Sequence, residues 1–299
     1  MHQQHEVDSR NIVISIVLNA VITIAEFIGG ILSNSLALLS DAVHNLSDTM
    51  AMFISWLAYK IGKRKSNTHK TFGYKRIEII AAFVNGSVLL FISFYLFWEA
   101  YKRFVEPEPI KENLMFIVAT IGLIANLISV LLLRKDSGRN LNIKAAYWHL
   151  LGDTLSSVGV IIGSLLILWL EITWVDPLLT IIIGLMILRG TWQIVKEAFN
   201  ILMEASPEHL NIHEIKSRLE EHPEIANVHH IHSWKVSDES THFQCHADLK
   251  SNLNLQAADS IRKELEAILL RKFNIDHVTI QMEYNSCHDK GAISNSRNC

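Results

Sequence analysis

Long apolar stretches alternate with short polar segments over the first two thirds of the chain. Six of these stretches reach the roughly 20 residues that a helix needs to cross the hydrocarbon core of a bilayer. The pattern therefore predicts a membrane α-helical domain with six transmembrane helices. The stretches lie at residues 11–32, 36–59, 78–101, 114–134, 144–170 and 177–200.

After Pro207 the pattern changes to shorter amphipathic segments. Apolar residues with helical spacing predict two helices, and alternation of apolar and polar residues predicts three strands. The order helix, strand, strand, helix, strand indicates a small α+β domain with its helices on one face of a three-stranded sheet. The expected helices lie at 210–221 and 257–273, and the expected strands at 228–236, 241–249 and 277–284.

These patterns divide the chain into four parts. A polar N-terminal arm occupies residues 1–10, and the six-helix transmembrane domain occupies residues 11–206. The α+β domain follows at residues 207–284. The remaining residues, 285–299, are polar and are expected to form a disordered tail.

Composition agrees with a membrane part joined to a soluble part. Hydrophobic residues make up 49% of the 299 residues, and the mean hydropathy of +0.23 is too high for an ordinary soluble protein. A net charge of −3 and a pI near 6.6 exclude the basic character of nucleic-acid binders. Cys245, Cys287 and Cys299 form no even framework, so we expect reduced thiols facing the cytosol.

The distribution of basic residues predicts the orientation in the membrane. Seven Lys and Arg residues lie in 60–76 and four more in 134–144, and such short basic loops face the cytoplasm. The three basic residues around the third turn, Lys102, Arg103 and Lys111, are a minority against this rule. With six spans, both termini are then cytoplasmic.

Ionisable residues inside two of the apolar stretches are the strongest functional signal. A charge at the centre of a transmembrane helix costs roughly 2.5 to 3.5 kcal/mol, so it marks a functional site by default. His44 and Asp48 are four residues apart on one helical face, and His149 and Asp153 repeat that spacing. Two imidazoles and two carboxylates suit four-coordinate zinc.

Each pair also has a structural interpretation, because a buried histidine often only satisfies a buried aspartate. Two such pairs in two spans make that interpretation weaker. Asp41 lies on the same face as His44 and either orients that imidazole from outside the ligand shell or sits near the start of the helix. The sequence leaves the role of Asp41 open.

The stretch at residues 33–48 resembles the second-helix signature of the cation diffusion facilitator family of zinc transporters, and His149 with Asp153 resembles its fifth-helix pair. The resemblance covers residues 11–283. It implies a bacterial-type zinc transporter in the inner or plasma membrane, with a cytoplasmic ferredoxin-like domain that forms a homodimer. The histidine-rich loop that some members carry between helices four and five is absent.

The resemblance also implies a metal site in the soluble domain. His69, in the basic loop at 60–76, lies near a weaker metal position of the family, although a solvated loop histidine is the simpler interpretation. Strand alternation places His230 and His232 on one side of the sheet and His229 on the other. The residues that fall near the family's cytoplasmic metal ligands are His232, His246, His277 and Glu283.

Two departures from the family pattern concern this soluble site. Some members place the last histidine where Asp276 stands here, and others use a histidine in the second soluble helix, where this chain offers Asp259. Either carboxylate could substitute as an oxygen ligand. Exposed histidines without a metal are the alternative.

The sequence therefore predicts a zinc transporter that exchanges the metal for protons and is not an enzyme. The resemblance implies that the zinc moves out of the cytosol. Metal binding requires neutral imidazole and ionised carboxylate, so it releases protons. An intramembrane metalloenzyme would keep a coordination position for water beside a general base, and four protein ligands close that position. A membrane metal sensor without transport remains an alternative, although it would not explain the paired sites in two spans.

Overall fold

The structure is a computed structural model that describes residues 9–134, 141–237, 240–285 and 291–293. The side chains of a few residues within these ranges, Asp48 among them, are outside the description. The predictions for most of the N-terminal arm and C-terminal tail, and for Cys287 and Cys299, also lie outside the described residues.

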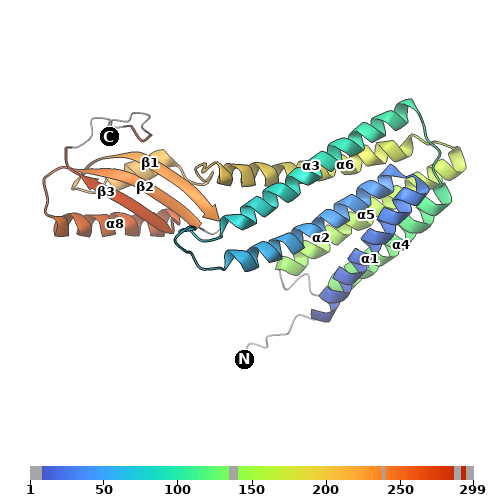
Figure 1. The fold of residues 1–299 in the computed structure, drawn as a ribbon, viewed down its shortest axis with the longest axis horizontal. Coiled ribbons are helices and arrows are strands. Elements are labelled where there is room, and N and C mark those ends of the chain that lie inside the picture. The colour runs from blue at the N-terminus through green and yellow to red at the C-terminus, as the bar shows by residue number, and fades with distance from the viewer. Residues whose placement is uncertain (1–8, 135–140, 238–239, 286–290, 294–299) are drawn as a thin grey trace. The chain divides into compact units, whose positions relative to one another are not determined.

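Six long helices form the first two thirds of the chain (Figure 1). Each predicted apolar stretch lies inside one of them, so the periodicity located the helices correctly. They are α1 (Ser9–Ser33), α2 (Leu36–Gly62), α3 (Arg76–Val105), α4 (Glu112–Arg134), α5 (Leu141–Leu170) and α6 (Val175–Leu202).

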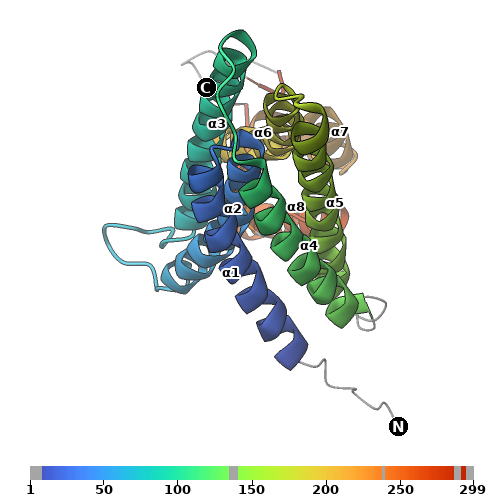
Figure 2. The same ribbon diagram turned by 90° about the vertical axis from the view of Figure 1, so that its right-hand side faces the viewer.

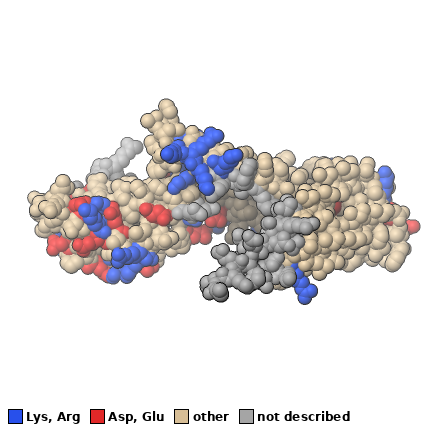
Figure 3. All heavy atoms as spheres, turned by 90° about the horizontal axis from the view of Figure 1, so that it is seen from below, with Lys and Arg blue, Asp and Glu red and all other residues tan. Residues whose placement is uncertain are grey.

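By length and composition, four helices in the described part of the chain can cross a membrane: α3, α4, α6 and residues 147–170 of α5. In α1 the described apolar stretch, Val17–Ser33, is shorter. The face shown in Figure 3 presents a broad uncharged surface over the long helices. Exposed apolar side chains such as Phe91 and Trp98 on α3 are those expected of a helix in contact with lipid. The count of six spans stays a prediction.

The chain divides into two compact units, one formed by residues 1–56 and 84–195 and the other by residues 57–83 and 196–299. In the first unit α4 lies beside both α1 and α5 (Figures 1 and 2). Gly29 permits the close approach of α1 to α4, because a Cβ atom there would lie 2.7 Å from the Val118 side chain. Small residues at such contacts are typical of membrane helix packing.

The second unit contains the α+β domain, whose five elements follow the predicted order. A mixed sheet has the order β1-β2-β3, with β1 and β2 antiparallel and β2 and β3 parallel. The two helices pack against the sheet and each other around a core that includes Leu219, Phe243 and Leu265. The elements are α7 (Ile212–Glu220), β1 (Ile225–Ser237), β2 (Ser240–Leu249), α8 (Leu255–Phe273) and β3 (His277–Glu283).

A β-bulge interrupts the pairing of β1 with β2. His229 pairs with His246 and His232 pairs with Gln244, so one extra residue is accommodated between the two pairs. His230 has a φ of 53°, in the left-handed region that one class of bulge uses and that few non-glycine residues adopt. The strand alternation predicted from the sequence is therefore wrong across this point: His229 and His232 lie on the same face of the sheet.

Candidate metal centres

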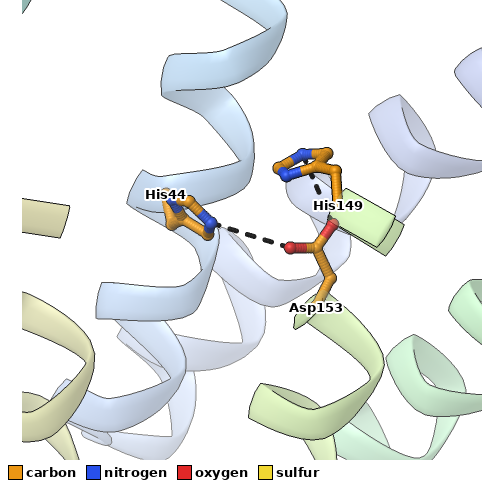
Figure 4. A group of neighbouring side chains, drawn as sticks. All are labelled: His44, His149 and Asp153. Carbon is orange, nitrogen blue, oxygen red and sulfur yellow. Dashed lines mark ion pairs between the residues drawn. The ribbon is translucent and has the colours of Figure 1, made fainter. Parts of the chain in front are cut away.

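Helices α2 and α5 bring three ionisable side chains together (Figure 4). His44 on α2 has its Nε2 atom 3.6 Å from Oδ1 of Asp153 on α5, and His149 on α5 has its Nε2 atom 3.6 Å from Oδ2. Ligands of a tetrahedral zinc ion at about 2.05 Å would lie about 3.3 Å apart. The spacing is therefore close to that of a metal coordination shell.

Burial differs sharply within this cluster. The Asp153 side chain is 1% exposed, whereas the side chains of His44 and His149 are 32% and 40% exposed. A carboxylate lying between two imidazoles supplies the negative charge that a divalent cation needs. The buried carboxylate is thus flanked by two partly exposed histidines.

Asp41 does not join this cluster directly but links the same two helices. It is buried, and its Oδ1 accepts a hydrogen bond from the hydroxyl of Ser156 at 2.6 Å. Ser156 is one helical turn beyond Asp153, and Asp41 is one turn before His44. The contact therefore holds α2 against α5 beside the two histidines, a role that the sequence left open.

Another buried carboxylate, Glu26 on α1, lies next to the α2 side of the site. One oxygen accepts a hydrogen bond from the side-chain amide of Asn45 at 3.0 Å, and the other has no hydrogen-bond partner among the described residues. Asn45 directly follows His44 in the chain. Glu26 thus connects α1 to the helix turn that carries the first histidine.

The start of α2 is held by a carboxylate from another helix. Asp176 on α6 accepts hydrogen bonds from the Ser35 hydroxyl at 2.5 Å and from the backbone N–H groups of Leu36 and Ala37 at 2.9 and 3.2 Å. A carboxylate at a helix N-terminus satisfies unpaired N–H groups and the positive end of the helix dipole. Arg103 on α3 lies 3.6 Å from Asp176 and balances its charge.

Arg103 also completes the connection between α2, α3 and the loop that follows α3. Its guanidinium donates to the backbone and side-chain oxygens of Asn34 and lies 3.6 Å from Glu108. Asn34 in turn donates to Glu108 at 2.9 Å. This network fixes the position of α2 along its own axis. It therefore also fixes where His44 lies relative to the residues of α5.

A second group of potential metal ligands lies on the sheet of the second unit. His229 on β1, His246 on β2 and Glu283 on β3 come from three neighbouring strands, and their ligand atoms lie within 4.8 Å of one another. Glu283 Oε1 is 2.7 Å from His246 Nδ1, and Oε2 is 3.5 Å from His229 Nε2. Unlike the helix cluster, all three side chains are at most 10% exposed.

His229 is oriented for such a role. Its Nδ1 lies 3.1 Å from the amide of Asn227, while its Nε2, which faces Glu283, has no hydrogen-bond partner among the described residues. Burial lowers the pKa of His229 from its ordinary value, and the nearby Glu283 carboxylate partly offsets that shift. The imidazole is therefore neutral near pH 7, the form that binds a metal.

Two family models match adjoining parts of the chain. The one described as the cation efflux transmembrane domain matches residues 12–203, and the one described as the cation efflux protein cytoplasmic domain matches residues 207–285. The chain belongs to the cation efflux family. The resemblance to cation diffusion facilitators is thus confirmed, and this cation efflux protein is an integral membrane protein with a C-terminal soluble domain.

Several curated bacterial relatives match nearly the whole length of this cation efflux protein. The zinc transporter ZitB of Pectobacterium atrosepticum is 38% identical over 284 residues, covering 94% of this chain and 88% of that protein. The cadmium, cobalt and zinc/H(+)-K(+) antiporter of Bacillus subtilis is 37% identical over 295 residues, which cover 98% of this chain and 94% of that protein. The metal cation efflux system protein CzcD of Cupriavidus metallidurans is 36% identical, covering 95% and 90%.

The structure brings together some of the residues predicted for the soluble site and separates others. His246 and Glu283 lie together, but His232 is exposed beside Gln244, and His277 pairs with His242 at the other end of the sheet face. Asp259 forms ion pairs with Arg262 and Lys263 on its own helix. The ring of His230 lies between those of His232 and His246, with centroid distances of 5.1 and 4.9 Å, so the metal role of His232 stays a prediction, as does that of His277.

Two further predicted candidates lie apart from both clusters. Asp276 accepts a hydrogen bond from the Thr241 N–H at 2.8 Å and so caps the start of a strand pairing. His69 is exposed in the loop between α2 and α3, where it lines a cavity of about 570 Å³ together with His232. Asp48, the fourth predicted ligand of the helix site, has its side chain outside the described residues.

Sequence reasoning missed His229 because it assumed a regular strand. Three histidines within four residues, at 229, 230 and 232, signalled that some of them gather on one face. Only the bulge at His230 selects His229 as the residue opposite His246. A left-handed histidine cannot be read from composition or alternation.

Proposed function

We propose that this protein carries zinc out of the cytosol in exchange for protons, through a site formed by α2 and α5. The observation that carries the proposal is the convergence of His44, His149 and Asp153 from two apolar helices to ligand-atom separations within 4.8 Å. Isolated ionisable groups are costly inside a membrane, so a cluster of metal ligands there favours a cation pathway. Asp48, one turn beyond His44, is the proposed fourth ligand.

The names of the relatives support zinc as the substrate. Two of the relatives above carry zinc in their names, one as a zinc transporter and one as an antiporter of cadmium, cobalt and zinc. Two imidazole nitrogens with carboxylate oxygens form a borderline ligand set that suits zinc and its neighbours among transition metals. We therefore expect zinc to be the main cargo and related divalent ions to compete with it.

Exchange for protons follows from the chemistry of the ligands. Zinc displaces protons from histidine and aspartate when it binds, and protons displace zinc when they return. Alternate exposure of one such site to the two sides of the membrane couples the two movements. The antiporter of Bacillus subtilis is named for both protons and potassium, so potassium is a second candidate counter-ion.

The proposal includes six membrane spans, α1 to α6, with both termini in the cytoplasm. Basic residues in the loop between α2 and α3 and in the connection between α4 and α5 support this orientation. Bacterial relatives favour the bacterial inner or plasma membrane. The soluble domain, in which the elements run helix, strand, strand, helix, strand, is proposed to be the ferredoxin-like domain of the family and to form the homodimer contact.

A second metal ion is proposed to bind His229, His246 and Glu283 on the sheet. Their burial, and the absence of a hydrogen-bond partner for His229 Nε2 among the described residues, support a site that retains its ion. It either stabilises the soluble domain or senses cytosolic zinc. These are the two roles that a site outside the transport path can have.

The proposed activity is transport and not catalysis. A membrane metal sensor would also bind zinc between α2 and α5, but it would move none. To separate them, the purified protein is reconstituted into liposomes that contain a zinc-sensitive dye, and zinc is added outside. Zinc uptake that follows an imposed proton gradient supports antiport. Zinc uptake that follows only a potassium gradient would identify potassium, and not the proton, as the counter-ion. Zinc binding without uptake under either gradient contradicts transport.

A further inference from the structure

The polar face of the sheet carries a second histidine group that the metal clusters do not use. His242 on β2 pairs with His277 on β3, and their ring centroids lie 4.7 Å apart. His242 is four residues from His246 along β2, which corresponds to about 13 Å. The two groups therefore occupy opposite ends of one face.

His242 is enclosed by rings from three directions. Trp234 of β1 stacks on it with the ring centroids 5.5 Å apart. Phe72 of the loop between α2 and α3 contacts it edge-on, with the ring centroids 5.4 Å apart. The residue is only 7% exposed, and its Nδ1 atom has no hydrogen-bond partner among the described residues. An unpaired polar atom at such a depth is costly, so it indicates a ligand that the protein atoms do not supply.

A cavity of about 580 Å³ opens beside this imidazole. Positive side chains from the loop between α2 and α3 line one side of the cavity, and the sheet lines the other. Ser66 and Ser240 add hydroxyl groups to the lining. The charged and titratable residues around it are Arg64, Lys75, His242, Asp276 and His277.

The charged residues that line this cavity determine whether it favours a cation or an anion. Arg64 and Lys75 are exposed cations, whereas the carboxylate of Asp276 already accepts the Thr241 N–H. Among the described residues the field therefore repels a metal cation and attracts an anion. Asp238 and Glu239 lie outside the described residues.

We propose that this cavity binds a phosphate-type anion, with Lys75 and Arg64 as its charge partners and His242 Nδ1 as a hydrogen-bond donor from inside. Guanidinium and ammonium groups around one pocket are the usual means of holding phosphate oxygens. The phosphate can belong to a free cytosolic ion or to an anionic lipid headgroup, because the loop that supplies the cations joins two membrane helices. The inference does not depend on the transport proposal.

The test uses the full-length protein purified in a maltoside detergent that contains no phosphate. Line broadening of inorganic phosphate in ³¹P spectra measures binding of the free ion. The single variant Lys75→Gln and the double variant Arg64→Gln with Lys75→Gln remove the exposed cations. Lys65→Gln is the matched control, because Lys65 is an exposed cation of the same loop that does not line the cavity.

We expect the double variant to weaken phosphate binding by about tenfold or more, and Lys65→Gln to leave it unchanged. A second arm measures retention of phosphatidylglycerol against phosphatidylcholine by native mass spectrometry of the same three proteins. Loss of phosphatidylglycerol retention in the double variant, without binding of inorganic phosphate, assigns the site to lipid. Equal behaviour of the double variant and Lys65→Gln in both arms overturns the proposal.

A zinc titration of His242→Gln and His277→Ala separates the anion site from a metal site. The anion proposal expects both variants to bind as many zinc ions as the unaltered protein. A loss of one bound zinc ion in either variant would show that this end of the sheet holds metal instead. Because Lys75 and Arg64 are exposed, their variants keep the test decisive even if His242→Gln is unstable.

Discussion

The cluster on α2 and α5 and the cluster on the sheet present the same ligand types, two imidazoles and one carboxylate, on different scaffolds. On the helices, two partly exposed histidines flank a buried aspartate. On the sheet, all three side chains are buried, and each comes from a strand that is hydrogen-bonded to its neighbour. The first cluster is accessible and the second is enclosed.

Under the proposed function, this difference lets one ligand chemistry serve two tasks. Helices α2 and α5 share no backbone hydrogen bonds, so they can separate and exchange an ion. The strands are joined by a ladder of backbone hydrogen bonds, so His229, His246 and Glu283 keep their spacing. We therefore expect rapid exchange at the helix cluster and retention at the sheet cluster.

The largest effect is expected for Asp153→Ala, which removes the carboxylate that lies between both histidines. Zinc flux into proteoliposomes should fall to the level of protein-free liposomes, because only one carboxylate, that of the proposed ligand Asp48, would remain to balance the charge of a divalent cation. Asp259→Ala, which removes an exposed aspartate of the soluble domain, is the control and should keep normal flux. Substantial flux in Asp153→Ala would rule out the helix cluster as the transport site.

A large but incomplete loss is expected for Asp176→Asn. The neutral amide accepts these hydrogen bonds less strongly than the carboxylate does. The start of α2 is then held less firmly, and the position of His44 along the helix axis becomes less well defined. The zinc concentration for half-maximal flux should rise by about tenfold. Asp176→Glu, which keeps the charge, should recover part of the affinity.

Glu283→Gln, measured beside Asp176→Asn, compares the effect of the sheet cluster and of the α2 position on the zinc concentration for half-maximal flux. Glu283 belongs to the sheet cluster, so Glu283→Gln should leave the zinc concentration for half-maximal flux nearly unchanged when that cluster only stabilises the soluble domain, and should shift it when the cluster senses zinc. If Asp176→Asn transports zinc with unaltered half-saturation, the position of α2 does not depend on this network. That result would leave Asp41 and Ser156 as the contact that sets the height of His44.

A moderate effect on stability is expected for the double variant His229→Ala with His246→Ala. Zinc at about 100 times its Kd should raise the Tm of the unaltered full chain by about 5 °C, and the double variant should lose that increase. Its zinc flux should remain within about threefold of normal, since the proposed transport ligands are untouched. Thermal scans with and without zinc measure the first effect.

His232→Ala distinguishes the structural ligand set from the one predicted by the sequence. It should keep the zinc-dependent rise in Tm, because His232 pairs with Gln244 and is exposed. His213→Ala, which alters an exposed histidine of α7, serves as the control for general loss of imidazole. Loss of the Tm increase in His232→Ala alone would restore the predicted set.

The smallest effect is the pH dependence that comes from His242. Its pKa is lowered in the folded protein from 6.5, so the folded chain binds fewer protons than the unfolded chain. The stability that it contributes is complete above pH 6.5 and is lost as the pH falls through the folded pKa. In phosphate-free buffer, His242→Gln should reduce the acid-induced decrease in Tm by on the order of 1 °C. An unchanged slope would mean that His242 titrates normally.

The sequence by itself determined the elements and the ligand chemistry of this protein. Apolar periodicity located all six long helices and the two helices and three strands of the soluble domain, because burial patterns repeat within each element. The spacing of four residues placed His149 and Asp153 on one face of α5, where the structure brings His44 to meet them. Local geometry was sufficient for each of these features.

Only the tertiary structure decided which distant residues meet. The bulge at His230 places His229 opposite His246, where an unbroken register from His232 and Gln244 would place His230, and the choice depends on pairing between two strands rather than on either strand alone. Asp176 reaches the start of α2 across about 140 residues of chain, and Asp41 finds Ser156 on α5. These contacts form because helix packing and strand register leave buried polar groups that need partners, and no local pattern records which partner lies opposite.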